Sequence, residues 1–416
     1  MTPELNSIAA RIREFISRTS GTGVSPVSSS ASNSDGEFNS LVLELFALQF
    51  SNNVPYRYFC LSRGIVKPGS VEHWTQIPAV PASAFKELEL TCLAPADRTT
   101  VFHSSGTTEQ RPSRHFHCAE SLALYEASLW SWFQPHVLAG STIGHWQLAI
   151  LTPPPIAAPN SSLVHMFQTV RRKSGAGEVA FLSDVGADGA WTLDFVRATI
   201  VIQGAIDLSQ PLVLLGTAFN FVHLLDELAV RNLRFELPAD SVVMETGGYK
   251  GRSRELPKAE LHALITKLLG VASSQIICEY GMSELSSQAY DGVAGDEWRV
   301  TGGTKTSRHA PLATRHFHFP PWARAQIISP ETGREVAEGE TGRVRVFDLA
   351  NAFSVLAVQT EDLAIRRGAG FELLGRAPAS EPRGCSLMAS LVVPPSGGSC
   401  PEPPKGGTPN PAARKS

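Results

Sequence analysis

The feature that most constrains this fold is an alternation, between about residues 98 and 281, of short apolar runs and helix-length amphipathic segments. Each run ends in a small or turn-forming residue, as a buried strand does where it leaves a sheet. Helices are expected between the runs, over residues 119–134, 217–231 and 256–269. This alternation predicts a layered α/β domain that binds ligands where its strands end. The runs are QLAILTP (147–153), ATIVIQG (198–204), PLVLLGT (211–217), SVVMETGG (241–248) and SQIICEYG (274–281).

The residues before this region predict two helices and a link. An N-terminal helix is expected over residues 1–18, because apolar side chains recur there at helical spacing behind a proline. Residues 19–36 carry seven serines and little that is apolar, so they predict a flexible link. A second helix is expected around residues 38–51, and VPYRYFC (54–60) predicts an ordered aromatic turn. The α/β core as a whole is assigned to residues 37–300.

After residue 300 the pattern changes to one of hairpins. Residues 323–349 read as two or three strands joined by Thr-Gly turns, and residues 301–392 are assigned to a small β-rich subdomain. The last segment, residues 393–416, is rich in proline and glycine and lacks the apolar side chains that a core needs. It is therefore expected to be a disordered tail.

Charge and cysteine content exclude several classes of function. The net charge of −3 gives no general attraction to nucleic acid or to an anionic membrane surface. Apolar runs long enough to span a bilayer are absent from the sequence, as is an apolar N-terminal leader segment. The six cysteines show no CxxC spacing, which favours reduced thiols and a cytoplasmic protein.

Two pairs of histidines have a spacing that would place both members on one face of a strand. They are His115 with His117, and His316 with His318. Such a pair suits a metal site, but it is more often solvated or part of the core. The spacing alone leaves both interpretations open.

Residues 100–117, TVFHSSGTTEQRPSRHFH, place small and hydroxyl-bearing residues side by side and follow them with cations. A cluster of this kind is typical of a surface turn, and also of a loop whose hydroxyl and backbone N–H groups bind phosphates. The stretch alone does not choose between the two. The small residues are Ser104, Ser105, Gly106, Thr107 and Thr108, and the cations that follow are Arg111 and Arg114.

Further polar stretches follow predicted strands later in the chain. METGGYKGR (244–252) leaves a strand with two glycines, which lets a flat ring approach the backbone closely. CEYGMSEL (278–285) offers an aromatic ring, a hydroxyl and a carboxylate at a strand exit. QTEDLA places Asp362 after a predicted strand, and GFELLGR ends in Arg376. Because each stretch lies at a predicted strand end, we expect them to meet at one edge of the sheet.

In this order the stretches resemble those of the adenylate-forming superfamily, whose enzymes activate carboxylic acids with ATP. They are most similar to the acyl-protein synthetase (LuxE) family, through the motifs SSGTT, TGGYKGR, YGMSEL, PPWARAQIISPETG, VQTEDLA and RGCSLM. The resemblance covers about residues 38–392. It implies a large domain of layered α/β sheets, a small β-rich C-terminal subdomain and a truncated or missing C-terminal lid.

The resemblance also implies a reaction and its partners. Members of the family activate a fatty acid as its acyl-adenylate, with ATP and Mg²⁺, and then carry the acyl group on a cysteine of their own. A partner protein, an acyl reductase or an acyltransferase, receives the acyl group. The substrate implied here is therefore a carboxylic acid, with a long-chain fatty acid as the first expectation.

Carried over residue by residue, the resemblance implies a nucleotide site. Residues Ser104 to Thr108 would hold the ATP phosphates through hydroxyl and backbone N–H groups. Tyr280, followed by Gly281, would pack on the adenine ring beside Gly247 and Gly248. The glycines would leave room for that ring at the strand end.

The resemblance further implies the groups that perform the chemistry. Ser283 would reach the phosphate, and Glu284 would hold Mg²⁺ and so take part in catalysis. Asp362 would accept hydrogen bonds from the ribose hydroxyls, with Arg376 close by. Cys385, in the RGCSL stretch, would be the acyl carrier.

Two departures from the superfamily pattern keep other functions open. Glu109 stands where the phosphate loop usually has a glycine, and its charge would repel a triphosphate. The chain also ends about forty residues after Arg376, too early for a lid bearing an adenylation lysine. Together they raise the alternative of a non-catalytic protein that binds a nucleotide or an acyl group. A carboxylate–CoA ligase of the phenylacetate-activating type is a second alternative, although the short end favours an acyl-protein synthetase over a full CoA ligase.

Overall fold

A computed structural model gives the fold over residues 2–20, 28–104, 111–138, 146–176, 179–187, 189–247, 256–293 and 315–376. The α-helices in these ranges are α1 (Pro3–Ser20), α2 (Ser28–Asn52), α3 (Val54–Ser62), α4 (Ala84–Glu87), α5 (Ala119–Val137), α6 (Ser162–Ser174), α7 (Phe195–Asp207), α8 (Ala218–Val230) and α9 (Lys258–Leu269). The strands are β1 (Val80–Pro81), β2 (Thr100–His103), β3 (Arg114–His117), β4 (Gln147–Ile150), β5 (Val179–Phe181), β6 (Ser183–Val185), β7 (Trp191–Leu193), β8 (Leu212–Thr217), β9 (Val242–Thr246), β10 (Ile276–Tyr280), β11 (Ala289–Val293), β12 (Arg315–His318), β13 (Ala323–Ile328), β14 (Thr341–Asp348), β15 (Ala357–Arg367) and β16 (Gly370–Arg376).

One 12-stranded sheet joins the two halves of the protein. Its order is β13-β14-β15-β16-β12-β11-β10-β9-β8-β4-β5, and β1 pairs with β15 off this path. The strands at one end of this order, β10, β9, β8, β4 and β5, pair with one another in parallel. The pairs from β10–β11 along the order to β14–β13 are antiparallel. Two separate hairpins, β2–β3 and β6–β7, lie outside the sheet.

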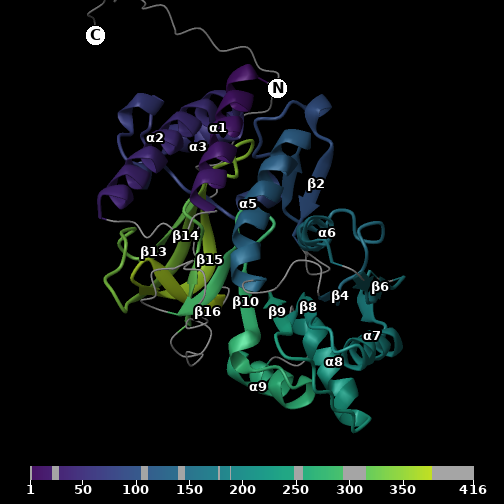
Figure 1. Ribbon diagram of the computed structural model, residues 1–416. Coiled ribbons are helices and arrows are strands. Elements are labelled where there is room, and N and C mark those ends of the chain that lie inside the picture. Colours follow the sequence, from purple (N-terminus) through teal and green to yellow (C-terminus); the bar gives the residue numbers. More distant parts are fainter. Residues whose placement is uncertain are drawn as a thin grey trace, which may run out of the picture.

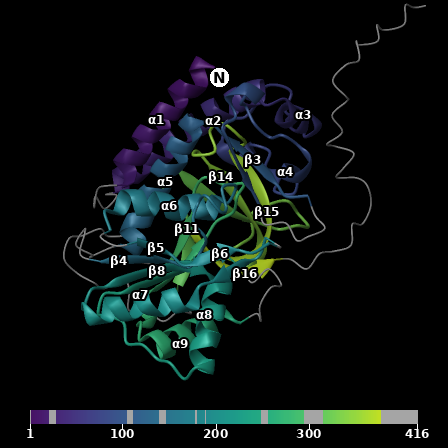
Figure 2. The ribbon, with the colours of Figure 1, turned by 90° about the vertical axis from the view of Figure 1, so that its right-hand side faces the viewer.

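Helices cover both faces of the parallel half of the sheet. Figure 2 shows α5 and α6 on one face and α7, α8 and α9 on the other. Alternate residues of the strands face the two helical layers, so Leu148 and Met244 pack in the first core and Ala149 and Val243 in the second. Strands buried on both faces read as near-continuous apolar runs. The predicted layered α/β fold is therefore confirmed.

The N-terminal helices pack with the antiparallel half. In Figure 1, α1, α2 and α3 lie together beside β13, β14 and β15. The amide of Gln49 in α2 donates to the carbonyl of Asn351 at 2.9 Å and accepts from the backbone N–H of Leu356, also at 2.9 Å. Gln49 is fully buried, so this side chain stabilises the turn between β14 and β15 from within the core.

The run ATIVIQG, expected to be a strand, instead lies in α7. Asp194 caps this helix by accepting a hydrogen bond from the backbone N–H of Arg197 at 2.9 Å. β-Branched residues suggested a strand, but burial follows the helical spacing of three and four residues. The buried residues of α7 are Ala198, Ile202 and Ala205.

Two expectations for the N-terminal region also differ from the structure. VPYRYFC is not a turn but lies in α3, because Asn53 caps the helix by accepting from the N–H of Tyr56 at 3.2 Å. Pro55 occupies an early helical position, where its missing N–H costs nothing. Helix α2 begins at Ser28, so helical backbone enters the segment predicted as a link. The predicted tail lies outside the described residues.

Within the described part of the chain, none of the helices combines the length and apolar character needed to cross a bilayer.

Candidate active site

The carboxyl ends of three parallel strands meet at one edge of the sheet. Thr217 at the end of β8 pairs with Thr246 in β9, and Thr246 pairs with Glu279 in β10. Gly247 follows β9 with φ +70°, and nothing lies within 4 Å of the position that a Cβ atom would occupy. The backbone is therefore open beside Gly247, as the close approach of a planar ring requires.

A hydrogen bond joins the side chains of Tyr280 and Asp362 at this edge. The Tyr280 hydroxyl donates to Asp362 Oδ2 at 2.8 Å, and Arg376 Nε lies 3.6 Å from Asp362 Oδ1. The expectation that Asp362 follows a strand is wrong, because Asp362 lies inside β15 and pairs in register with Arg376 in β16. The hairpin extends the strand through the TED stretch and presents both side chains side by side.

Aromatic rings enclose the Tyr280 side chain. Its ring centroid lies 5.4 Å from that of Phe371, 6.0 Å from Phe317 and 6.1 Å from Phe319. Only 7% of Tyr280 is exposed, so its ring is fixed while its hydroxyl reaches Asp362. The aromatic groups form a wall at the strand edge.

The hydroxyl-rich stretch begins at Ser104, where the chain leaves β2 for the loop that connects it to β3. Ser104 Oγ accepts a hydrogen bond from the backbone N–H of Ser113 at 3.0 Å, which joins the two ends of the loop. Ser105 to Thr108, and Glu109, lie outside the described residues. Arg111 lies 3.8 Å from a carboxylate oxygen of Glu87, and Arg114 lies 3.3 Å from one of Glu89. These cations therefore pair with the segment that contains α4.

Glu284 is a buried carboxyl group close to this hairpin. It is 6% exposed, and burial raises the pKa of its carboxyl above the usual value. The Ser113 hydroxyl and the positive charges of Arg376 and Lys86 oppose that rise. These influences connect Glu284 with both the hairpin and the Asp362–Arg376 pair.

The surroundings of Glu284 fit a divalent cation. Glu284 is buried and burial disfavours its charged form, so an added positive charge would stabilise the carboxylate here. Groups of three or more metal-ligating side chains are absent from the described residues. A single carboxylate matches the way Mg²⁺ is held together with substrate phosphates and water.

The turn that carries Ser283 and Glu284 is held by residues that the sequence analysis did not single out. Asp348 accepts hydrogen bonds from the backbone N–H groups of Ser286 and Ser287, at 3.0 and 2.8 Å. Asn351 donates to the carbonyl of Glu284 at 2.9 Å. An aspartate at the end of an apolar run and an asparagine three residues later were the available sequence signal.

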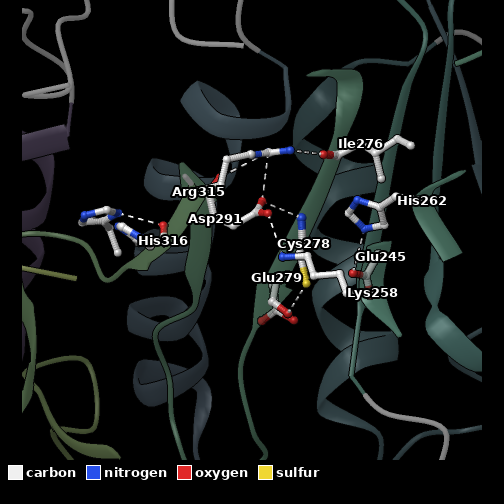
Figure 3. A network of polar contacts seen from close by, with 10 residues as sticks. Glu245, Lys258, His262, Ile276, Cys278, Glu279, Asp291, Arg315 and His316 are labelled. Atoms are coloured by element: carbon white, nitrogen blue, oxygen red, sulfur yellow. Dashed lines mark hydrogen bonds and ion pairs between the residues drawn. The ribbon is translucent and has the colours of Figure 1, made fainter. Parts of the chain in front are cut away.

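A buried ionic network lies beside the same strands (Figure 3). Asp291 in β11 lies 2.9 Å from Lys258 Nζ and 3.0 Å from Arg315, and it accepts from the backbone N–H of Cys278 at 2.8 Å. Burial alone would raise the pKa of Asp291, but Lys258 and Arg315 hold it below its usual value. The network ties α9, β10 and β12 together, and Lys258 is engaged in it.

Two buried glutamates flank the end of β9. Glu245 lies 3.3 Å from the His262 ring, and Glu279 accepts a hydrogen bond from the Thr246 hydroxyl. Burial raises the pKa of Glu279 to about 7, against the Thr246 bond and with the help of the neighbouring Glu245. Glu279 was not among the predicted site residues, although a glutamate inside an apolar run is unusual.

The described part of the chain thus brings most of the predicted nucleotide residues to one edge of the sheet. Gly247, Tyr280 and Gly281 lie at the strand ends. Ser113 bonds to Ser104 and acts on Glu284, His115 bonds to Ser283, and Arg376 pairs with Asp362. Gly248 and the proposed carrier Cys385 lie outside the described residues. The members connected in this way are Ser104, Ser283, Glu284, Asp362 and Arg376.

Both histidine pairs occupy strands as expected. His115 and His117 share one face of β3, with ring centroids 4.3 Å apart, and both are almost fully buried. Because His115 and His117 are buried, this pair belongs to the core. In the second pair, in β12, burial lowers the pKa of His316 and of His318.

The family model that describes acyl-protein synthetases of the LuxE type matches residues 169–392, more than half of the chain. The chain belongs to the acyl-protein synthetase (LuxE) family. It is also 22% identical over 366 residues to the long-chain-fatty-acid–luciferin-component ligase of Aliivibrio fischeri, covering 85% of this chain and 88% of that protein. The family predicted from the motifs is thereby confirmed, and with it the class of ATP-dependent acyl-activating ligases.

Solved structures of adenylate-forming ligases share the fold. 2-Hydroxyisobutyryl-CoA ligase with 2-HIB-AMP and CoA matches with a TM-score of 0.59 at 14% identity, over 82% of this chain and 68% of that one. The same ligase in its postadenylation state matches with a TM-score of 0.57, again at 14% identity and over 82% and 68% of the two chains. The chain spans about half, 49%, of an ATP-bound RpMatB-BxBclM chimera, which matches 68% of this chain at 16% identity with a TM-score of 0.45.

Proposed function

We propose that this protein uses ATP to convert a carboxylic acid into its acyl-adenylate and then carries the acyl group as a thioester on Cys385. The observation that carries the proposal is the hydrogen-bonded pair Tyr280–Asp362 at the end of β10, next to the strand end where the backbone is open at Gly247. A carboxylate at a strand edge, fixed by a tyrosine and next to a cation, suits the two hydroxyls of a ribose ring.

The remaining groups suit the phosphates. Ser104 lies where the chain leaves β2, and the buried Glu284, whose pKa is raised, is under the influence of the Ser113 hydroxyl of the same hairpin. When bound, Mg²⁺ would neutralise charge on the phosphate oxygens. The proposed role of the chain is to orient the nucleotide: Asp362 would hold the ribose, Ser283 would reach the phosphate, and Glu284 would hold Mg²⁺. The aromatic wall would exclude water.

The proposed chemistry has two balanced steps. A carboxylate oxygen of the acid attacks the α-phosphorus of ATP, and pyrophosphate leaves with the electrons of the broken P–O bond. The Cys385 thiolate then attacks the acyl carbonyl carbon, and AMP leaves. The first step converts a poor electrophile into one with a good leaving group, which is why the second can take place at a thiol.

The cysteines in the described part of the chain are poorly suited to carry the acyl group. Burial raises the pKa of the Cys60 thiol to about 12, that of Cys92 to about 12, and that of Cys278 well above its usual value. Cys118 is buried at the start of α5. Because the nucleophile is the thiolate, these positions are unfavourable and Cys385 remains the proposed carrier.

The proposed acid is a long-chain fatty acid, and a partner acyl reductase or acyltransferase would take the acyl group onward. The name of the Aliivibrio fischeri relative, a long-chain-fatty-acid ligase, supports the fatty acid. The alternative acceptor is CoA, which the related 2-hydroxyisobutyryl-CoA ligase structure contains. In that case Cys385 would have no role in the reaction.

A labelling experiment separates the two acceptors. The protein is incubated with radiolabelled fatty acid and ATP–Mg²⁺ without CoA, then denatured and treated with neutral hydroxylamine. We expect label that survives denaturation, is released by hydroxylamine and is absent from Cys385→Ser. The matched variant Cys278→Ser should keep its label. Label that persists in Cys385→Ser, or forms only when CoA is added, would contradict the carrier assignment.

A further inference from the structure

His115 connects the phosphate-loop hairpin to the turn that carries Glu284. It lies in β3, where it pairs with Phe102 of β2. Two residues before it, the backbone N–H of Ser113 donates to Ser104 Oγ at 3.0 Å, so His115 is part of the structure that closes the loop. From there its ring reaches across to the carbonyl oxygen of Ser283, 2.8 Å from Nδ1.

The environment of His115 fixes the direction of this hydrogen bond. A carbonyl oxygen only accepts, so Nδ1 must carry the proton and donate it. The residue is 2% exposed, and burial lowers its pKa to about 4 even though the Ser283 carbonyl favours the protonated ring. The ring is therefore neutral near pH 7. Phe85 of α4 packs against it edge-on, with ring centroids 5.9 Å apart.

The turn is anchored on its other side as well. Asp348 binds the N–H groups of Ser286 and Ser287, and Asn351 binds the carbonyl of Glu284. These contacts tie the turn to the β14–β15 region. The His115 bond to Ser283 ties the turn to the β2–β3 hairpin, at the residue directly before Glu284 and in addition to the influence of the Ser113 hydroxyl on Glu284.

We propose that His115 is a positioning residue that holds the Ser283–Glu284 turn in place against the β2–β3 hairpin, whose two strands carry the ends of the phosphate loop. The inference rests on the proposed adenylation function, since it assigns His115 the task of aligning two parts of that site. His115 acts through Ser283 and Glu284 and touches neither ATP nor the acid. A displacement of about 1 Å at a reacting group can lower a rate by about a hundredfold, so a single anchoring bond here affects turnover.

His117 provides a matched control in the same strand. It lies on the same face of β3, is 1% exposed, and its ring is next to that of His115. Its Nδ1 lies 3.1 Å from Ser121 Oγ at the start of α5, away from the turn. Substitution of either histidine disturbs the same core, but only substitution of His115 removes the tie to Ser283.

The experiment compares His115→Phe, His115→Asn, His117→Phe and His117→Asn with the wild-type protein. Each is measured for thermal stability, for the shift in melting temperature caused by ATP–Mg²⁺, and for the kcat and KM of acid-dependent ATP–pyrophosphate exchange. We expect His115→Phe to lose kcat by about tenfold or more while its stability matches that of His117→Phe. His115→Asn, whose side-chain N–H can replace Nδ1–H, should recover most of kcat.

Equal exchange in His115→Phe and His117→Phe would overturn the inference, as would the absence of any recovery in His115→Asn. Failure of the proposed function looks different, because the wild-type protein itself would then show no exchange. The ATP–Mg²⁺ shift decides the inference in that event. A smaller shift in His115→Phe than in His117→Phe supports it, and equal shifts overturn it.

Discussion

The Tyr280 hydroxyl donates a hydrogen bond to Asp362 across 2.8 Å, joining residues that are 82 positions apart in the sequence. The bond links the end of the parallel part of the sheet to a strand of its antiparallel part. It also fixes one oxygen of a carboxylate whose other oxygen lies 3.6 Å from Arg376. The proposed ribose site therefore depends on contact between the two halves of the fold.

Tyr280→Phe should weaken nucleotide binding more than it weakens folding. The variant keeps the aromatic ring but removes a hydrogen bond to a charged group, a loss of roughly 1.5–3 kcal/mol. We expect a roughly tenfold rise in the Kd for ATP, measured by calorimetry, because about 1.4 kcal/mol corresponds to that factor. Tyr290→Phe is the control, since the Tyr290 hydroxyl is buried without a hydrogen-bond partner in the described structure. Equal ATP affinity in the two variants would refute the ribose role of the Tyr280–Asp362 pair.

Glu284→Gln should abolish the part of ATP stabilisation that depends on Mg²⁺. The substitution removes the charge but keeps the shape of a side chain that is 6% exposed, so the free protein should stay folded. A ligand at about a hundred times its Kd stabilises the folded state by about 2.7 kcal/mol, which a melting curve detects. Melting temperatures with ATP are compared in excess Mg²⁺ and in EDTA. If the magnesium-dependent increment survives in the variant, Glu284 does not hold the ion.

Glu279→Gln should stabilise the protein at alkaline pH relative to wild type. Because burial raises the folded-state pKa of Glu279 from its ordinary value of 4.5 to about 7, the folded protein binds a proton that the unfolded chain has lost. The free energy of unfolding therefore falls as pH rises from about 4.5 to 7, by about 3 kcal/mol for this group, and glutamine avoids that loss. The melting temperature of the variant relative to wild type should rise between pH 5 and pH 8. A pH-independent difference would show that Glu279 titrates normally.

Local patterns were sufficient to predict the layers of the fold and the position of the motifs. The runs that became β4, β8, β9 and β10 are apolar because both of their faces are covered by helices. Their ends bring Gly247 and Tyr280 to one edge, as the parallel arrangement requires. The helices expected near residues 119–134, 217–231 and 256–269 are all present, with small differences at their ends.

Two predictions of secondary structure, for the run in α7 and for Asp362, were wrong because local composition did not determine the backbone there. The run in α7 is rich in β-branched residues, but Asp194 caps it and burial follows a helical period. Asp362 was expected to follow a strand, whereas pairing with Arg376 continues β15 through this residue. Propensity is a weak guide when a cap or a neighbouring strand determines the backbone.

The contacts that fix the site could not be predicted, because they join distant residues. His115 and Ser283 are 168 positions apart, and Ser287 and Asp348 are 61 apart. Each of these contacts depends on how whole elements pack, which no local pattern records. The role of Cys385 was assigned from resemblance, and it stays a prediction because that residue lies outside the described part of the chain.

The most direct test of the account is acid-dependent ATP–pyrophosphate exchange by the wild-type protein, measured across a panel of fatty and aryl acids with Mg²⁺ and without CoA. We expect exchange with long-chain fatty acids and no exchange without an acid. Cys385→Ser should show the same acid-dependent exchange, since adenylation precedes acyl transfer. Asp362→Asn should lower the rate while leaving the protein folded. A folded protein that binds ATP but exchanges pyrophosphate with none of these acids would contradict the account and identify a non-catalytic nucleotide-binding protein.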